Sequence, residues 1–509
     1  MRVNWKIFAL LCLGLSILSA ATARADKADD TLKIVWGSNG PIESVDLYFS
    51  TRRTAMELSA LIWDTLVWRD PATFEYKPLF AKAWRQVDPL TLEFDLRDDV
   101  KFHDGTPFTA KDVVQTLTTV ADPAFKVRVP RNVNWIAKVE EVSPYRVRVI
   151  SKAPFPPALD YIATAIPIYP GDYYAKVKPE GMHKAPVGTG PYKATSIETA
   201  KAYKLVRNDD YFKNSVKGSS FIKNIDIREV PDAQTQVAEL LGRRAHLIWD
   251  ITADQVDQIE KMRGFKVLRA ETMRVGYLGL DAAGRSPNKA LQNLDVRRAI
   301  AHAVNRESIV KNLVRGSARV VDTPCYEKQF GCVTEAAAHY DYSPEKAKEL
   351  LKKSGLEKVE FDLYVIPLLQ PIAEAIASDL GKVGITARLR TMEYPGLHDA
   401  QFKDQTPAVL LSWGSYSVND VSAMIGLFFL PGPEDYARDA DLHKWLKTAE
   451  TTVDPAIRKD AYRQSVARIT DQVYWLPMYT FVKNYAFSDT IEFPVSADEF
   501  TRLYMVHWR

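Results

Sequence analysis

A single carboxylate, Asp420, stands in a long uncharged part of the sequence. From Gln405 through Pro433 it is the only charged residue. An ionised carboxylate in apolar surroundings is costly unless it is solvated, hydrogen-bonded by backbone or paired with a cation. Asp420 could therefore cap the helix expected in VSAMIGLFF, or it could bind the cationic group of a ligand. A carboxylate has enough acceptor positions to do both.

Other residues that could do chemistry give weaker signals. The motifs GxGxxG, GxxxxGK[ST], HExxH and GxSxG are absent, and the two SxxK patterns, at Ser308 and Ser343, lack the companion motifs SDN and KTG. Ser343 is better explained as a helix cap. The eight histidines are scattered, with none within four residues of another, and His103 is expected to be structural. We therefore expect no catalytic residue, no metal site and no cofactor.

The N-terminus has the pattern of an export signal. Arg2 and Lys6 precede an apolar run at 7–18, and a small-residue pattern follows at 23–25. The run is too short to cross a bilayer as a helix, so we expect cleavage after residue 25 and a location in the periplasm, the alternative being an uncleaved anchor. Cleavage would remove three of the 67 basic residues and no acidic residue, which leaves 64 of each sign. A neutral chain of this kind is not expected to bind nucleic acid.

Two cysteines, Cys325 and Cys332, remain after that cleavage. Outside the cytoplasm, a small disulfide loop is expected for this spacing rather than a metal site.

The elements that must position these residues alternate between strands and helices. Strand patterns occur at 32–36, 92–96, 358–366 and 384–390, and the strand at 92–96 is expected to be half-buried with Glu93 and Asp95 facing solvent. Helix starts are expected at Thr109, Asp232, Ser343 and Asp454, and Gly242 and Gly355 are expected to end two of these helices. The sequence therefore predicts an α/β protein with more than one domain.

Four stretches resemble one family in its own order along the chain. They are LIWDTLVWRDPATFEYKPLFAKAW with LEFDLRDDVKFHDGTPFTAKDVV, then VGTGPYK with VRNDDYF, then LGLD with LDVRRAIAHAVNRESIV, and finally DPAIRKDAYRQSVARITDQVYWLPMY. They are similar to the family 5 extracellular solute-binding proteins, the peptide-binding group that serves ATP-driven importers. The resemblance covers nearly the whole chain after the signal.

The resemblance implies a two-lobed periplasmic binding protein of type II-like architecture. Residues 26–275 would form the first lobe, with an extra small subdomain at about 71–185. Residues 276–480 would form the second lobe, and residues 481–509 would return to the first. The lobes would close over a ligand by movement at two chain crossings, near YLGLD and near MYTFV.

The resemblance also implies a binding site. Asp420 occupies the place of an aspartate that pairs with a peptide's ammonium group, and Trp413 and Tyr416 would supply apolar walls, although both could instead pack in the core. The remaining predicted ligand contacts are Gly414, Ser415 and Asn419 in the same loop, and Ser38 and Asn39 in the loop after the first strand. Dipeptide-specific members carry an arginine in a region where this chain has no basic residue between Lys358 and Lys382, so a defined dipeptide clamp is not expected.

The function that follows from the resemblance is capture of di- or oligopeptides and their delivery to an inner-membrane permease complex, by a monomer that is not an enzyme. One alternative is another solute on the same fold: an opine, an oligosaccharide, or nickel or another metal chelate. A remote alternative is a serine hydrolase of the SxxK type.

Overall fold

The computed structural model describes residues 27, 29–37, 41–219 and 222–509. The predicted signal peptide and the predicted ligand contacts Ser38 and Asn39 lie outside the described residues. The names first lobe, second lobe and small subdomain are used below for the predicted residue ranges. Among the described residues, no helix combines the length and the apolar character needed to cross a membrane.

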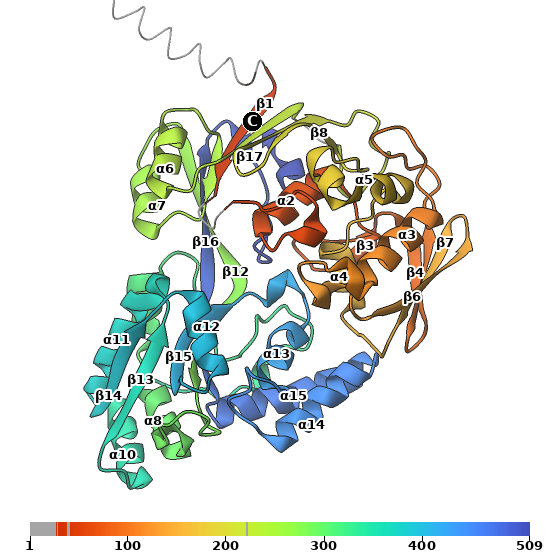
Figure 1. Cartoon of the computed structure of the whole chain (residues 1–509). Helices are drawn as coiled ribbons and strands as arrows, with labels where there is room; N and C mark the ends of the chain where they lie inside the picture. Colours follow the sequence, from red (N-terminus) through yellow and green to blue (C-terminus); the bar gives the residue numbers. More distant parts are fainter. Residues whose placement is uncertain (1–26, 28, 38–40, 220–221) are drawn as a thin grey trace, which may run out of the picture.

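A ten-stranded mixed sheet runs through the molecule. Its strand order is β14-β13-β15-β12-β16-β11-β1-β10-β9-β8. The long strands β12 (Phe265–Leu280) and β16 (Trp475–Ser488) lie side by side and connect the two parts of the sheet, as Figure 1 shows. The other strands are β1 (Thr31–Trp36), β8 (Tyr192–Glu198), β9 (Ala202–Arg207), β10 (Asn224–Glu229), β11 (Leu247–Trp249), β13 (Val359–Val365), β14 (Ile385–Thr391) and β15 (Ala408–Trp413).

The pairing between β12 and β16 is interrupted near its middle. Glu271 pairs with Val482 and Val275 with Thr480, and the register shifts between these two pairs. An interrupted ladder lets a strand bend. The predicted lobe boundaries, at 275/276 and 480/481, fall beside this interruption, and the division into lobes stays a prediction.

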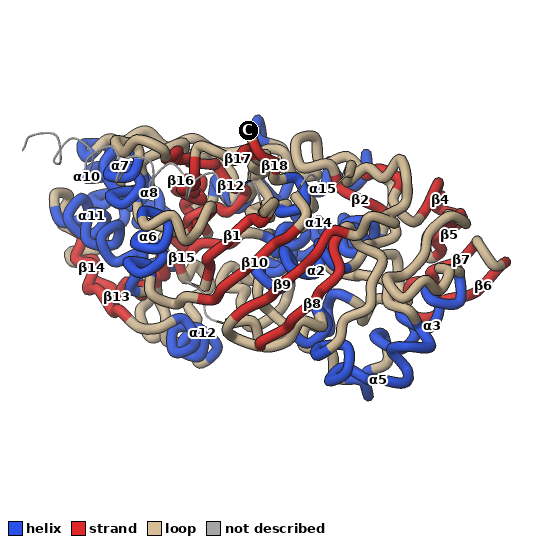
Figure 2. The backbone as a smooth tube through the Cα atoms, turned by 90° about the horizontal axis from the view of Figure 1, so that it is seen from above, coloured by secondary structure: helices blue, strands red, loops and turns tan. Residues whose placement is uncertain are grey.

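The small subdomain contains a separate antiparallel sheet of order β4-β5-β7-β6, which lies at one end of the molecule in Figure 2. Its strands are β4 (Ala81–Asp88), β5 (Thr91–Leu96), β6 (Ile136–Ser143) and β7 (Arg146–Ser151). The predicted strand at 92–96 is confirmed, but the prediction that Glu93 faces solvent is wrong. Glu93 is 1% exposed because it pairs with Arg85 and, at 2.6 Å, with Arg148.

Helices cover both parts of the large sheet and flank the small one. They are α2 (Arg53–Ile62), α3 (Ala110–Ala121), α4 (Ala158–Thr164), α5 (Gly171–Lys184), α6 (Ala233–Leu241), α7 (Ala253–Ile259), α8 (Leu294–Ala303), α9 (Arg306–Ile309), α10 (Pro344–Ser354), α11 (Gln370–Gly381), α12 (Tyr394–Phe402), α13 (Ile425–Phe429), α14 (Ala440–Thr451) and α15 (Pro455–Asp471). Two short hairpins complete the fold: β2 (Val67–Arg69) with β3 (Tyr76–Pro78), and β17 (Ile491–Glu492) with β18 (His507–Trp508).

The predicted helix ends are confirmed where the signal is local. Thr109 and Asp112 form a capping box at the start of α3, and Ser343 caps α10, which ends at a left-handed Gly355. Asp232 and Asp454 cap α6 and α15 through their carboxylates. The predicted α/β class is therefore confirmed.

Apolar residues form separate cores on the two sides of the β12–β16 crossing. The largest core joins α2 and the small subdomain with residues that follow β16, such as Phe493, Leu503 and Tyr504. Two other cores cover opposite faces of β15 and its neighbours, one with α8 and α11 and the other with α14 and α15. The C-terminal segment thus packs with the first lobe.

Candidate ligand-binding site

The loop after β15 has an unusual backbone. Ser415, Tyr416 and Ser417 have φ values of 51°, 51° and 64° in succession. The left-handed region is unfavourable for residues other than glycine, and such conformations are found where the surrounding structure enforces them, often at functional sites. Hydrogen bonds from the backbone N–H of Ser417 to Gly414 O, at 2.9 Å, and of Val418 to Ser415 O, at 2.8 Å, close the turn.

Two aromatic residues, Trp413 at the end of β15 and Tyr416 in the loop, pack together, and Tyr416 contacts the small subdomain. Trp413 donates its indole N–H to Ala423 O at 2.8 Å and packs edge-on against the Tyr416 ring, with the centroids 4.6 Å apart. Tyr416 remains 47% exposed. The guanidinium of Arg131, from the small subdomain, lies 4.3 Å from the Tyr416 ring centroid, a distance typical of a cation–π contact. Tyr416 is therefore an accessible ring at a place where the two lobes meet.

Asp420 has both a cap role and an internal cation. Its carboxylate accepts the backbone N–H of Ser422 at 3.0 Å, which confirms the predicted cap, although the segment that follows is the short 3₁₀ helix Val421–Ala423. Nη2 of Arg458, on α15, donates to the two carboxylate oxygens at 2.8 and 3.0 Å. The role of Asp420 as a ligand anchor stays a prediction, and a ligand there would have to share the carboxylate with Arg458.

The other predicted contacts in the loop lie against the first lobe and the C-terminal segment. The backbone N–H of Asn419 donates to the Asp160 carboxylate of the small subdomain. Ser415 is fully buried, and its hydroxyl has no hydrogen-bond partner among the described residues. Gly414 is packed so closely that an added Cβ would lie 2.7 Å from Oε2 of Glu499. Their common location is the lobe boundary.

A charged network ties this boundary together. Arg53, on α2, donates to the Ser417 hydroxyl at 2.5 Å and to Glu499 at 2.9 Å. The Ser417 hydroxyl in turn donates to Asp498 O at 2.7 Å. Burial acts to raise the pKa of Glu499, but the guanidinium groups of Arg274 and Arg53 outweigh it and hold that pKa at about 2. Glu499 is therefore ionised, and it holds Arg53 in position to bind Ser417.

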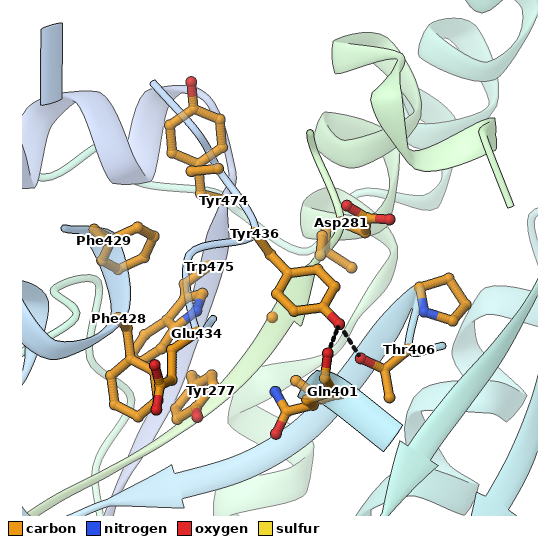
Figure 3. Close-up of a pocket in the computed structure, with 15 residues that line it drawn as sticks. Tyr277, Asp281, Gln401, Thr406, Phe428, Phe429, Glu434, Tyr436, Tyr474 and Trp475 are labelled. Atoms are coloured by element: carbon orange, nitrogen blue, oxygen red, sulfur yellow. Dashed lines mark hydrogen bonds between the residues drawn. The ribbon is translucent and has the colours of Figure 1, made fainter. Parts of the chain in front are cut away.

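A small cavity of about 20 Å³ lies in the second lobe, and Figure 3 shows its lining. The stacked rings of Tyr277 and Trp475, with centroids 3.5 Å apart, form part of its wall, and Phe428 packs against Trp475 at 4.8 Å. Glu434 places its carboxylate beside these rings. Among the described residues, no cluster of three or more His, Cys, Asp or Glu side chains could hold a metal ion.

Comparisons with known proteins identify the family. The model of the bacterial extracellular solute-binding proteins, family 5, matches residues 75–435. The chain belongs to this family.

Relatives of this family 5 protein cover nearly its whole length. It is 25% identical to the dipeptide-binding protein of Escherichia coli (strain K12), over 93% of each chain. It is also 25% identical to the nickel-binding periplasmic protein of the same organism, over 93% of this chain and 92% of the relative. The chain is therefore a solute-binding protein of the kind that serves ATP-driven importers, and not an enzyme.

Solved structures show the same fold. HbpA2 from Haemophilus parasuis aligns with a TM-score of 0.82 and 24% identity, over 94% of this chain and all of that one. The dipeptide-binding protein of Pseudoalteromonas sp. SM9913, in complex with Met-Leu, aligns with a TM-score of 0.75 and 20% identity over the same share of this chain. The fold of a periplasmic binding protein is thus confirmed.

Sequence reasoning missed several residues of the site. Arg458, Arg53 and Arg131 are far from the loop in sequence, and no spacing rule connects them with it. Glu434 had a usable signal, because it is the first acidic residue after the uncharged run and directly follows Pro-Gly-Pro, a sequence that fixes a turn. The disulfide between Cys325 and Cys332 is present, as predicted.

Proposed function

We propose that this family 5 protein captures peptides in the periplasm and delivers them, as a monomer, to an inner-membrane permease complex. The observation that carries the proposal is the position of Arg131 against Tyr416. Arg131 donates to the Tyr161 hydroxyl at 3.1 Å, and it has no carboxylate partner among the described residues. A guanidinium group binds a carboxylate through two parallel hydrogen bonds. Arg131 is thus suited to the carboxylate of a peptide that lies on the Tyr416 ring.

Closure would follow from the same arrangement. Arg131 belongs to the small subdomain of the first lobe, and Trp413 and Tyr416 belong to the second lobe. A ligand that contacts both sides favours the form in which they meet, by its difference in affinity for the open and closed forms. The importer would then recognise the closed form.

The names of the relatives support a peptide as the solute but are also compatible with other solutes. One relative is named for dipeptides and another for nickel, and one similar structure contains mannopinic acid. Aromatic walls accept side chains of varied shape, which favours a peptide over a compact ion. An opine, an oligosaccharide or a metal chelate would be a different outcome of the experiment below.

Native mass spectrometry of the protein from its host, followed by calorimetric titration, tests the proposal. The expected result is co-purified peptide and saturable binding of short peptides such as trialanine, with no binding of nickel–histidine. Arg131→Met should lower the affinity for trialanine at least tenfold. The control is Arg128→Met, since Arg128 is an exposed arginine three positions earlier whose side chain makes none of these contacts. Binding of an opine, a sugar or a nickel chelate in place of peptides would overturn the peptide proposal.

A further inference from the structure

Glu434 carries a carboxylate without a counter-ion inside the protein. It is half-buried, it lines the cavity of Figure 3, and no hydrogen bond or ion pair joins its side chain to any of the described residues. A partly buried carboxylate gains most from a cation that arrives with a ligand. We infer that Glu434 binds the cationic group of the solute, an inference that rests on the proposed function for its assignment to a peptide's ammonium group.

The backbone on both sides of Glu434 is held in place. Arg285 donates from Nη1 to Pro433 O at 2.7 Å and to Asp435 O at 3.1 Å. The Arg285 guanidinium also lies 4.2 Å from the Tyr436 ring centroid and pairs with Asp404. Arg285 therefore holds the backbone carbonyls on both sides of Glu434, and its guanidinium is paired with Asp404 and not with Glu434. A group that is held before the ligand arrives loses little conformational entropy on binding.

Asp435 also helps to fix the backbone next to Glu434. Its carboxylate accepts the backbone N–H groups of Ala437, at 3.0 Å, and Arg438, at 2.9 Å, and it contacts His443 at 2.7 Å. Asp435 is 1% exposed, whereas its neighbour Glu434 is half-buried. The Asp435 carboxylate is therefore bonded within the protein, whereas the adjacent Glu434 carboxylate lines the cavity.

The rings around Glu434 suit a cation. Tyr277, Trp475 and Phe428 form one packed group. Phe428 also packs against Trp413, with the ring centroids 5.5 Å apart. Trp413 in turn contacts Tyr416. Aromatic faces attract ammonium groups, and rings combined with a carboxylate are a known means of recognising them. The cavity thus has the composition of an ammonium site.

Glu434 and Arg131 carry opposite charges and have opposite effects on the pKa of Tyr416. Burial raises the pKa of Tyr416, Arg131 acts to lower it, and Glu434 acts to raise it further. Arg131 contacts the Tyr416 ring directly, whereas Glu434 lies beside Phe428 (Figure 3), which packs on Trp413 and through it on Tyr416. A zwitterionic peptide on this ring would place its ammonium group at Glu434 and its carboxylate at Arg131. Asp420, which is paired with Arg458, is not needed for the ammonium group in this arrangement.

The experiment compares Glu434→Gln with Glu349→Gln, a matched change at an exposed glutamate in the middle of α10. Calorimetry with trialanine and with N-acetyl-trialanine measures whether the cation matters. The expected result is at least a tenfold loss of trialanine affinity in Glu434→Gln alone, with weak binding of the acetylated peptide to both variants and an unchanged melting temperature. An unchanged trialanine affinity in Glu434→Gln, or an equal loss for both peptides, would overturn the inference.

A second probe separates this inference from the peptide proposal. Methylammonium chloride, whose ammonium group is about the size of a water molecule, is titrated with sodium chloride as control while the intrinsic tryptophan fluorescence of the protein is recorded. If the protein binds no peptide but methylammonium gives a saturable change that Glu434→Gln abolishes, the peptide proposal fails and the cation site is supported. If neither peptide nor methylammonium binds, both are rejected.

Discussion

The Asp420 carboxylate lies 2.8 Å from Nη2 of Arg458, and both side chains are about 5% exposed. Arg458 also donates to the Tyr462 hydroxyl at 3.0 Å and to Ala449 O at 2.9 Å. The single charge of the uncharged run is thus one half of a buried ion pair that joins the loop at 414–420, the proposed binding loop, to α15. Removing one partner of such a pair leaves an uncompensated buried charge.

Asp420→Asn should therefore destabilise the protein by about 3–5 kcal/mol, the usual cost of breaking a buried pair on one side. Denaturant unfolding, followed by circular dichroism, measures the loss. The double variant Asp420→Asn, Arg458→Met is the control, because it removes the unpaired charge and should recover part of the stability. A large loss of solute affinity with an unchanged unfolding midpoint would instead support Asp420 as the ligand anchor.

Glu450 should make the stability depend on pH near this pair. Burial, and then the charge of Asp420, raise the pKa of Glu450 from 4.5 to about 7, against the opposing effect of Arg458. Between pH 4.5 and pH 7 the folded protein keeps a proton on Glu450 that the unfolded chain releases. The contribution of Glu450 to the free energy of unfolding is therefore fully present below pH 4.5 and is lost as the pH rises through 7.

The expected difference is measurable with Glu450→Gln, which cannot ionise. Relative to this variant, the wild type should lose up to about 3 kcal/mol of stability between pH 5 and pH 8. Denaturant unfolding at the two pH values gives the comparison, and Glu349→Gln serves as the control for the loss of one surface charge. Identical pH dependence in wild type and Glu450→Gln would show that Glu450 titrates at an ordinary pKa.

How much the sequence predicts depends on the distance over which a contact acts. Ser343 and Gly355 bound α10 through bonds within a few residues, so the sequence shows both helix ends. The pair Arg53 and Ser417 is separated by 364 positions, and only the fold brings them together. The single acid at Asp420 was a real signal of a special environment, but its cation, 38 positions away, could not be read from spacing.

The Cys325–Cys332 disulfide should support the binding loop as well as the fold. The short segment that it closes bonds to that loop: Gln329 Nε2 donates to Val418 O at 2.9 Å, and the backbone N–H of Phe330 donates to Asn419 O at 3.1 Å. Replacing both cysteines by serine should cost roughly 2–3 kcal/mol, as loop-closure entropy predicts for a short loop. Solute affinity should fall as well, because the loop loses part of its support.

Thermal unfolding and calorimetric titration measure the two effects of the cysteine replacement. A reducing agent should produce the same changes in the wild type and none in the double serine variant, which controls for other effects of the reagent. Normal affinity in a destabilised double variant would show that the binding loop holds its shape without the disulfide.

Gly414→Ala should weaken closure, because the lobe boundary has no room for a methyl group there. The added Cβ would lie 2.7 Å from Oε2 of Glu499 and 3.0 Å from Nη2 of Arg274, and the pair that these atoms form cannot move away without loosening Arg53. The control is Gly381→Ala, where an added Cβ meets nothing within 4 Å. With the solute found by mass spectrometry, affinity should fall at least tenfold in Gly414→Ala only. X-ray scattering at saturating solute should then show a larger radius of gyration for Gly414→Ala than for the wild type. Equal radii and equal affinities would mean that the lobe boundary adapts to the methyl group. Close packing at Gly414 would then not control closure.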